Sequence, residues 1–181
     1  EFTIVSDEVY TKMAFRDTDS ITNHDCDYIC VGSFSKTFSM TGYRLGYAIS
    51  SPENIKKIQE LQQLTTTSPT EFAQFAALAA MDMMDKTSER ISRFYKKRMD
   101  EAVSLLETAG FEVVPAEGTF YLFPRLKADS NKFAMRLLEE GVSVLPGSPF
   151  GPYDNHFRIS LVTDRMDEAT RKMEKVRKEL E

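Results

Sequence analysis

Three short apolar runs in the first fifty residues predict β-strands. The runs cover residues 2–5, 27–33 and 43–49, and each is short enough to be a buried strand. No helix cap or polar tail precedes the first run, so we expect the chain to begin in the middle of a domain. These residues are therefore expected to be the remnant of a larger strand-rich domain.

Helical spacing replaces the strand pattern after residue 50. Ser51 can cap a helix that has Pro52 at its first position, and a second helical pattern crosses the small residues of 72–80. A longer and highly charged pattern covers 87–108 and stops at Gly110, a residue type that commonly ends helices. Three successive helices are expected in this region.

Strand and helix patterns alternate through the remaining residues. Helices are expected over 130–140 and from 164 onward, and strands in four short runs, at 111–114, 119–123, 142–145 and 157–162. This order predicts an α+β domain. The chain is thus expected to be of the α/β class, with the larger domain's remnant and the start of a linking helix in 1–90. A complete small α+β domain is expected in 91–181.

The balance of charged and apolar residues is that of an ordinary globular protein. The 181 residues include 23 basic and 28 acidic side chains, which leave a formal net charge of -5, and 41% of the residues are hydrophobic. No basic stripe or charged tail is present, so neither nucleic acid nor an anionic membrane is expected as a partner. No apolar run approaches the roughly 20 residues that cross a bilayer.

Few side chains are available as soft metal ligands. The chain has two cysteines, Cys26 and Cys30, and two histidines, His24 and His156. Because this set does not form a recognisable ligand spacing, no metal site is expected. Cys30 falls within an apolar run and is expected to be a small core side chain. Unpaired cysteines favour a reducing, cytoplasmic setting.

A lysine directly after the second apolar run is the first candidate for chemistry. Lys36 follows the strand expected at 27–33, and strand ends are where open α/β sheets bind ligands. A partly desolvated lysine loses its proton more easily and becomes a nucleophile toward carbonyl groups. Ser33, Ser35 and Arg44 supply the hydroxyl donors and the guanidinium that a phosphate group prefers. Taken alone, the motif also fits a surface lysine at the start of a loop.

An acid and a phenol follow the first apolar run. Asp7 stands at the end of this run, where its carboxylate can hold a ring nitrogen protonated, and Tyr10 can donate to a phenolate oxygen. The alternatives are a helix cap for Asp7 and core packing for Tyr10. With Lys36 and the phosphate-binding side chains, these groups together describe one cofactor, pyridoxal phosphate.

Four motifs give the sequence a close resemblance to one enzyme family. They are Ser-Asp-Glu-Val-Tyr, Ser-Phe-Ser-Lys-Thr-Phe-Ser-Met-Thr-Gly-Tyr-Arg-Leu-Gly-Tyr, Pro-Ala-Glu-Gly-Thr-Phe-Tyr and Phe-Arg-Ile-Ser, in this order. The chain resembles the class I/II aminotransferases, pyridoxal-phosphate enzymes of fold type I that are similar to aspartate aminotransferase. The resemblance covers essentially the whole chain and matches the carboxyl-terminal half of the family. It implies a remnant of the large domain's mixed sheet followed by the complete small domain.

The resemblance assigns a role to each candidate residue. It implies that Asp7 pairs with the pyridine nitrogen and that Tyr10 hydrogen-bonds the phenolic oxygen of the cofactor. Lys36 would carry the cofactor as an imine and would also move the proton during the reaction. Ser33 and Arg44 would bind the phosphate.

The resemblance also implies a substrate-binding residue and a reaction. Arg158, in Phe-Arg-Ile-Ser, matches the arginine that binds the substrate α-carboxylate, although it could equally be a surface cross-strand partner. The implied reaction transfers an amino group from an L-amino acid to a 2-oxo acid, in a homodimeric parent enzyme. The preferred amino acid stays open, and the chain alone is expected to be inactive.

Two other functions remain open from the sequence. A carbon–sulfur lyase or a synthase on the same fold would keep the same lysine, aspartate and arginines. The chain as it stands could also be a non-catalytic domain that retains the motif.

Overall fold

The computed structural model describes residues 2–181, which divide into two compact units. The amino-terminal unit ends at Arg93 and the carboxyl-terminal unit begins at Phe94, so the division falls inside the long helix α4 (Met84–Thr108). The functional boundary expected at residue 90 stays a prediction. Among the described residues, no helix combines the length and apolar character needed to cross a membrane.

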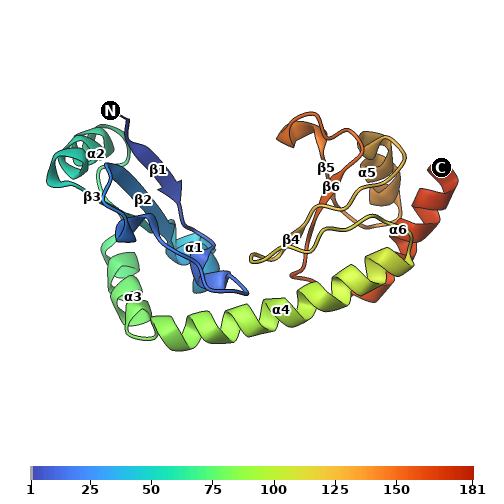
Figure 1. The fold of residues 1–181 in the computed structure, drawn as a ribbon, viewed down its shortest axis with the longest axis horizontal. Helices are drawn as coiled ribbons and strands as arrows, with labels where there is room; N and C mark the ends of the chain where they lie inside the picture. The colour runs from blue at the N-terminus through green and yellow to red at the C-terminus, as the bar shows by residue number, and fades with distance from the viewer. Residues whose placement is uncertain (1) are drawn as a thin grey trace. The chain divides into compact units, whose positions relative to one another are not determined.

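A mixed three-stranded sheet forms the centre of the amino-terminal unit (Figure 1). Its order is β1 (Ile4–Asp7), β2 (Tyr28–Ser33) and β3 (Gly46–Ser50), with β1 and β2 parallel and β2 and β3 antiparallel. All three expected strands are present. The third begins later than expected because a 3-10 turn covers Thr41–Tyr43 and Arg44 then adopts a left-handed conformation.

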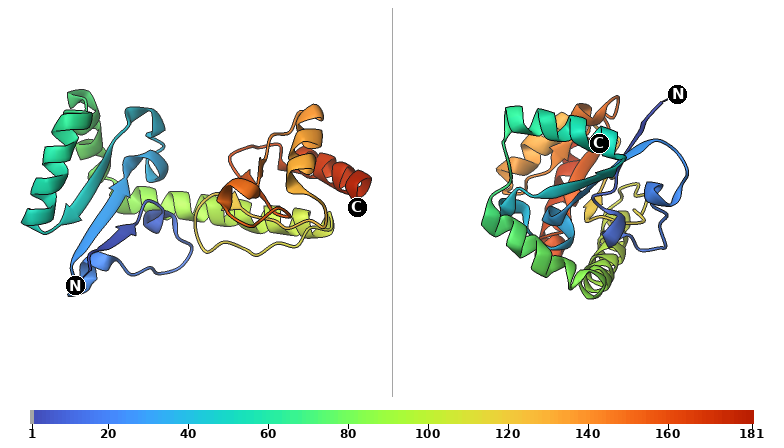
Figure 2. Two further views of the ribbon diagram at one scale, coloured as in Figure 1. Left: turned by 90° about the horizontal axis from the view of Figure 1, so that it is seen from above. Right: turned by 90° about the vertical axis from the view of Figure 1, so that its left-hand side faces the viewer.

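The parallel pair requires a crossover between its strands. Residues 8–27 make this connection and can be followed from the end of β1 to the start of β2 in Figure 2. The segment contains two 3-10 turns, Thr11–Met13 and Ile21–Asn23, and no α-helix. Both strands therefore end at the same edge of the sheet.

Three helices complete the amino-terminal unit before α4. They are α1 (Phe34–Thr37), α2 (Pro52–Thr65) and α3 (Glu71–Met81). The predicted cap of α2 is confirmed, because the Ser51 side chain accepts a hydrogen bond from the Asn54 N–H at 3.3 Å.

Small side chains hold α3 against the segment that carries the lysine motif. Ala73, Ala77 and Ala80 line the buried face of α3. They belong to one apolar cluster with Phe34, Met40 and Leu45. Alanine lets the helix backbone approach closely, so the segment is anchored by apolar side chains on both sides of Lys36. Ser33, Ser35 and Lys36 stay partly exposed beside this core, whereas Thr37 is buried.

Large apolar side chains occupy the opposite face of α3. Phe72, Phe75 and Leu78 are each more than 60% exposed, and Val5 of β1 is 67% exposed. Large apolar side chains are usually buried, but on α3 the small alanines are buried and the large side chains are exposed. The amino-terminal unit therefore leaves much apolar surface in contact with solvent.

A second sheet, entirely antiparallel, organises the carboxyl-terminal unit. Its order is β4 (Tyr121–Leu122), β6 (Phe157–Ser160) and β5 (Leu145–Pro146). Helices α5 (Ser130–Glu139) and α6 (Met166–Leu180) pack side by side.

Two expected strands of this unit differ from the structure: the run 142–145 is strand only from Leu145, and the run 111–114 does not form a strand. In the run 111–114, only Glu112 bridges to another segment, at Arg125. Phe111 turns into the core instead, where its ring lies 5.3 Å from that of Phe157 and 5.9 Å from that of Phe133. The two backbone hydrogen bonds between Glu112 and Arg125 and the packing of the Phe111 ring therefore position the segment.

Candidate functional site

Two of the predicted site residues share one face of the mixed sheet. Asp7 of β1 lies opposite Val31 of β2, and Ser33 is two residues further along β2. Alternate residues of a strand point to the same side, so Asp7 and Ser33 lie on one face at the carboxyl ends of two parallel strands. The strand spacing and rise place their Cα atoms roughly 8 Å apart. This is the edge at which open α/β sheets bind ligands.

The carboxylate of Asp7 is exposed and organises the backbone that follows it. Its Oδ1 accepts a hydrogen bond from the Val9 N–H at 3.1 Å, which makes a local turn. Asp7 does not cap a helix, because the residue at the cap position of the next 3-10 turn is Tyr10. Tyr10 is half-buried, and its carbonyl accepts from the Met13 N–H at 2.8 Å.

Ser33 caps the short helix that carries Lys36. Its Oγ accepts from the Ser35 N–H at 3.1 Å and makes a long, 3.5 Å donation to the Leu45 carbonyl. Lys36 lies in the only turn of α1 and is half-buried. The hydroxyl is therefore held near the helix start, and its weak donation can be redirected to an incoming anion at small cost.

Arg44 is held in an uncommon backbone conformation. Its φ is 54°, in the left-handed region that side chains other than glycine seldom adopt. One guanidinium donor, on Nη1, reaches the Thr41 carbonyl at 2.9 Å, and the Thr41 hydroxyl donates to the Ser35 carbonyl at 3.3 Å. These bonds tie the loop of Arg44 to the turn of Lys36. The guanidinium itself is exposed to solvent.

Arg158 belongs to the carboxyl-terminal unit, whereas the five cofactor candidates belong to the amino-terminal unit. It lies on β6 opposite Leu145 of β5. Its guanidinium carbon is 4.5 Å from the centre of the Tyr121 ring and 5.0 Å from that of Phe150. The structure thus places Arg158 against two aromatic rings, of which Tyr121 belongs to the neighbouring strand β4.

The carboxylate of Glu8 was not singled out from the sequence, although it stands beside Asp7. Its Oε1 accepts from the Ile21 N–H at 2.8 Å and from the Ser6 hydroxyl at 3.2 Å. Burial works to raise the pKa of Glu8, but these hydrogen bonds, with others from Ser20 and Cys30, lower it overall. The Glu8 carboxylate therefore fixes the crossover segment to the sheet.

An open cleft of about 820 Å³ surrounds Glu8. Cys30 and Tyr47 also line it, on the sheet face opposite to that of Asp7 and Ser33. Burial, reinforced by the Glu8 carboxylate, raises the pKa of the Cys30 thiol, and burial likewise raises the pKa of Tyr47. A buried thiol of this kind is a poor nucleophile, which fits its expected place in the core.

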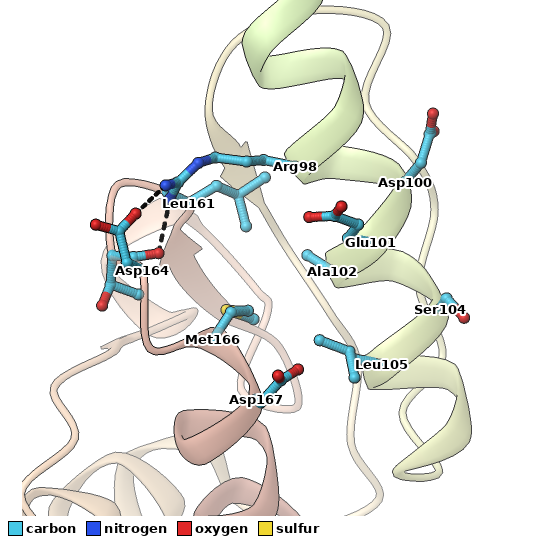
Figure 3. A pocket seen from close by; sticks show the side chains of 11 residues that line it. Arg98, Asp100, Glu101, Ala102, Ser104, Leu105, Leu161, Asp164, Met166 and Asp167 are labelled. Atoms are coloured by element: carbon cyan, nitrogen blue, oxygen red, sulfur yellow. Dashed lines mark hydrogen bonds and ion pairs between the residues drawn. The ribbon is translucent and has the colours of Figure 1, made fainter.

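A pocket of about 710 Å³ in the carboxyl-terminal unit lies between α4 and the loop before α6 (Figure 3). Arg98 donates to the Leu161 carbonyl at 3.0 Å and to the Thr163 carbonyl at 2.7 Å, and it pairs with Asp164. These hydrogen bonds and the ion pair tie the loop to the helix, so the role of Arg98 is structural. Within residues 2–181, no three histidine, cysteine or acidic side chains gather as a metal site.

Comparisons with known proteins agree with these motifs. The model of the family described as aminotransferase class I and II matches residues 1–172. The aspartate aminotransferase of Thermococcus kodakarensis is 38% identical over 98% of this chain and 48% of its own length. The crystal structure of an aromatic aminotransferase from Pyrococcus horikoshii matches with a TM-score of 0.89 and 35% identity, over 98% of this chain and 52% of that one.

A more distant structure shows the same fold. The α-aminoadipate aminotransferase LysN of Thermus thermophilus, complexed with N-(5'-phosphopyridoxyl)-L-leucine, matches with a TM-score of 0.90 at 22% identity. The match covers 98% of this chain and 50% of that one.

Family membership follows from the match along nearly the whole chain. The chain belongs to the class I and II aminotransferases and is similar to aspartate aminotransferase, which confirms the resemblance. It spans about half the length of the relatives it matches. The family depends on pyridoxal phosphate, whereas the roles of individual residues in this chain stay predictions.

Proposed function

We propose that this chain is the carboxyl-terminal half of a pyridoxal-phosphate-dependent enzyme that transfers an amino group from an L-amino acid to a 2-oxo acid. The observation that carries the proposal is the arrangement at one sheet edge. Asp7 and Ser33 share a face at the ends of parallel strands, and Lys36 follows in the next turn. Arg44 returns to that turn through Thr41.

The donor set of this edge fits the charge pattern of the cofactor. A phosphate dianion needs hydroxyl or N–H donors and a cation, which Ser33 and Arg44 offer from linked segments. A protonated ring nitrogen needs an anion, and the Asp7 carboxylate is exposed and uses Oδ1 in a single local hydrogen bond. The phenol of Tyr10 follows three residues later and would donate to the ring's phenolic oxygen. These groups bind and orient, and none of them needs to change its charge.

Lys36 is the group that would move a proton. Pyridoxal phosphate, when bound, supplies an electron sink that stabilises negative charge at the substrate's α-carbon. The Lys36 amine, in its neutral form, would accept the proton from that α-carbon and would return a proton to C4′ of the cofactor. Its place in α1, directly after the strand that ends at Ser33, supports this role, because the ends of such strands are where open α/β sheets bind ligands.

Arg158 would bind the α-carboxylate of the amino acid. Its planar guanidinium offers parallel N–H donors to the two carboxylate oxygens. Both substrates of a transamination carry this carboxylate, so one arginine can serve each half of the reaction. The side chain of the amino acid must be recognised elsewhere, and the preferred substrate stays open.

The relatives favour amino transfer over the lyase alternative, since those reported above are all aminotransferases by name. We also propose that the parent enzyme is a cytoplasmic homodimer and that the chain alone is inactive. The exposed apolar side chains of α3 and β1 support the second point, because they indicate that further protein surface covers this unit.

A trapping experiment tests the assignment of Lys36. The protein is mixed with pyridoxal phosphate, reduced with borohydride and digested, and the labelled peptide is identified by mass spectrometry. We expect the label on Lys36 in the full-length enzyme. The matched control is Lys57, an exposed lysine of the same unit that pairs with Glu53 at 2.7 Å and should stay unlabelled at stoichiometric cofactor.

Two variants separate the possible outcomes. Lys36→Arg should abolish both the label and the transfer of an amino group to a 2-oxo acid, whereas Lys57→Arg should change neither. Labelling spread over several lysines, or full transaminase activity in Lys36→Arg, would refute the assignment. Release of a thiol in place of amino transfer would favour the lyase.

A further inference from the structure

We propose that Tyr121 and Phe150 form an aromatic seat that positions the guanidinium of Arg158 for its carboxylate. This inference rests on the proposed function, in which Arg158 binds the substrate. It assigns a role to two residues outside the expected site. Both would be positioning residues, because they act through Arg158 and need not touch the substrate.

The sheet register brings the first ring to Arg158. Tyr121 of β4 lies directly opposite Ser160 of β6, and Ser160 is two residues from Arg158 on the same face. Tyr121 is therefore the diagonal neighbour of Arg158, within the reach of a long side chain. The guanidinium carbon lies 4.5 Å from the ring centre, inside the range of a cation–π contact.

The second ring comes from a different segment. Phe150 ends the 3-10 turn Ser148–Phe150 that follows β5, and the guanidinium carbon lies 5.0 Å from its ring centre. Two rings from separate elements thus contact one cation. A long arginine side chain has many rotamers, and contact with two rings selects among them before any ligand arrives.

Further aromatic rings support Phe150, which is 43% exposed. Phe123 meets the Phe150 ring edge to face at 5.7 Å. Phe123 also contacts His156, stacked at 5.1 Å with an angle of 15°, and Tyr153 at 5.5 Å. The Phe150 ring is therefore supported on one side, through Phe123, by a group of packed rings.

Aromatic rings suit a substrate-binding arginine better than a carboxylate partner would. A carboxylate would neutralise Arg158 and compete with the substrate for the same N–H donors. The faces of Tyr121 and Phe150 attract the cation without accepting those in-plane hydrogen bonds. The charge and the donors stay available for an incoming α-carboxylate.

Steady-state kinetics of the full-length enzyme test the seat. We expect Phe150→Leu and Tyr121→Leu each to raise KM for the amino acid about 3- to 10-fold, with kcat within about twofold of the wild type. Tyr121→Phe keeps the ring and should restore KM to within about twofold. A ring that only stabilised the fold would lower the amount of active enzyme and leave KM unchanged.

The matched control removes a comparable contact elsewhere in the same unit. Phe94 lies 4.7 Å from the guanidinium carbon of Arg98, which anchors a structural loop. Phe94→Leu should leave KM unchanged. An equal rise of KM in this control would show that the effect is not specific to Arg158 and would overturn the proposal.

A binding measurement separates failure of the seat from failure of the proposed function. The Nε–Hε resonance of Arg158, assigned with Arg158→Lys, is followed by NMR while maleate is added to the full-length protein. We expect the dissociation constant to rise about 3- to 10-fold in Phe150→Leu. Unchanged maleate binding in Phe150→Leu and Tyr121→Leu refutes the seat whether or not the wild type transfers amino groups. Absence of transaminase activity alone refutes only the proposed function.

Discussion

Adding a single methyl group at Gly32 should force a ring out of place. Gly32 of β2 lies opposite Tyr47 of β3, and the Tyr47 ring crosses directly over it. A Cβ at Gly32 would lie 2.2 Å from Cζ and 2.4 Å from Oη of this ring. Carbon atoms in contact are about 3.5–4.0 Å apart, so the ring must move by roughly 1.5 Å.

The expected cost follows from what the ring would lose. Tyr47 meets Phe34 edge to face at 5.7 Å, a contact worth about 0.5–1.5 kcal/mol. Overpacking of a fitted site adds to this, for a gross cost of about 1–3 kcal/mol. Alanine restricts the unfolded chain more than glycine, which returns about 0.5–1 kcal/mol. We therefore expect Gly32→Ala to lower the free energy of unfolding by up to about 2.5 kcal/mol.

A second substitution should reverse the sign of this effect. In a Tyr47→Ala background the ring is gone, so Gly32→Ala should be neutral or stabilise the protein by up to about 1 kcal/mol. Urea unfolding followed by far-ultraviolet circular dichroism gives the four free energies of the double-mutant cycle. Hydrogen exchange of the β2 and β3 amides shows whether the change is local to this sheet.

Gly46 provides the matched control. A Cβ there would lie 2.7 Å from the Gly32 carbonyl oxygen, a backbone atom that removal of Tyr47 does not free. Gly46→Ala should therefore be equally costly with and without Tyr47. If Gly32→Ala costs the same in both backgrounds, the reasoning about the ring is wrong.

Three further predictions concern the same unit. Arg44→Gly relieves a left-handed residue, so we expect the free energy of unfolding to change by less than about 1 kcal/mol while cofactor binding, followed by absorbance, weakens at least about tenfold; a matching loss of stability would contradict this. Thiol labelling should be fast at exposed Cys26 and slow at buried Cys30, and equal rates would show that the sheet is open. The pKa of Glu8 is lowered in the folded state, so its carboxylate stabilises the protein above its unfolded pKa of about 4.3, and this contribution is lost as pH falls through the folded pKa. The difference in stability between the wild type and Glu8→Gln, measured by urea unfolding, should therefore shrink below about pH 4.3; a constant difference would refute the role of its charge.

Structural features that depend on residues close together in the chain could be predicted from the sequence. Ser51 caps α2 as predicted because a serine before proline satisfies the helix start by itself. The strands ending at Asp7 and Ser33, and the turn carrying Lys36 after the second, follow in the same way from short apolar runs and their polar ends. The four motifs then sufficed to indicate the family.

Contacts between distant segments were decided only by the tertiary structure. The parallel register that places Asp7 and Ser33 on one face depends on which strands pair, and residue spacing does not encode that choice. The expected strand at 111–114 is reduced to a single bridge at Glu112, and the Phe111 ring packs against rings from distant segments. Arg158 contacts Tyr121 and Phe150 because β4 and β5 flank β6. The distances between these residues along the sequence do not predict that contact. Local chemistry thus determined which residues are candidates, and packing across the sheets determined what surrounds each of them.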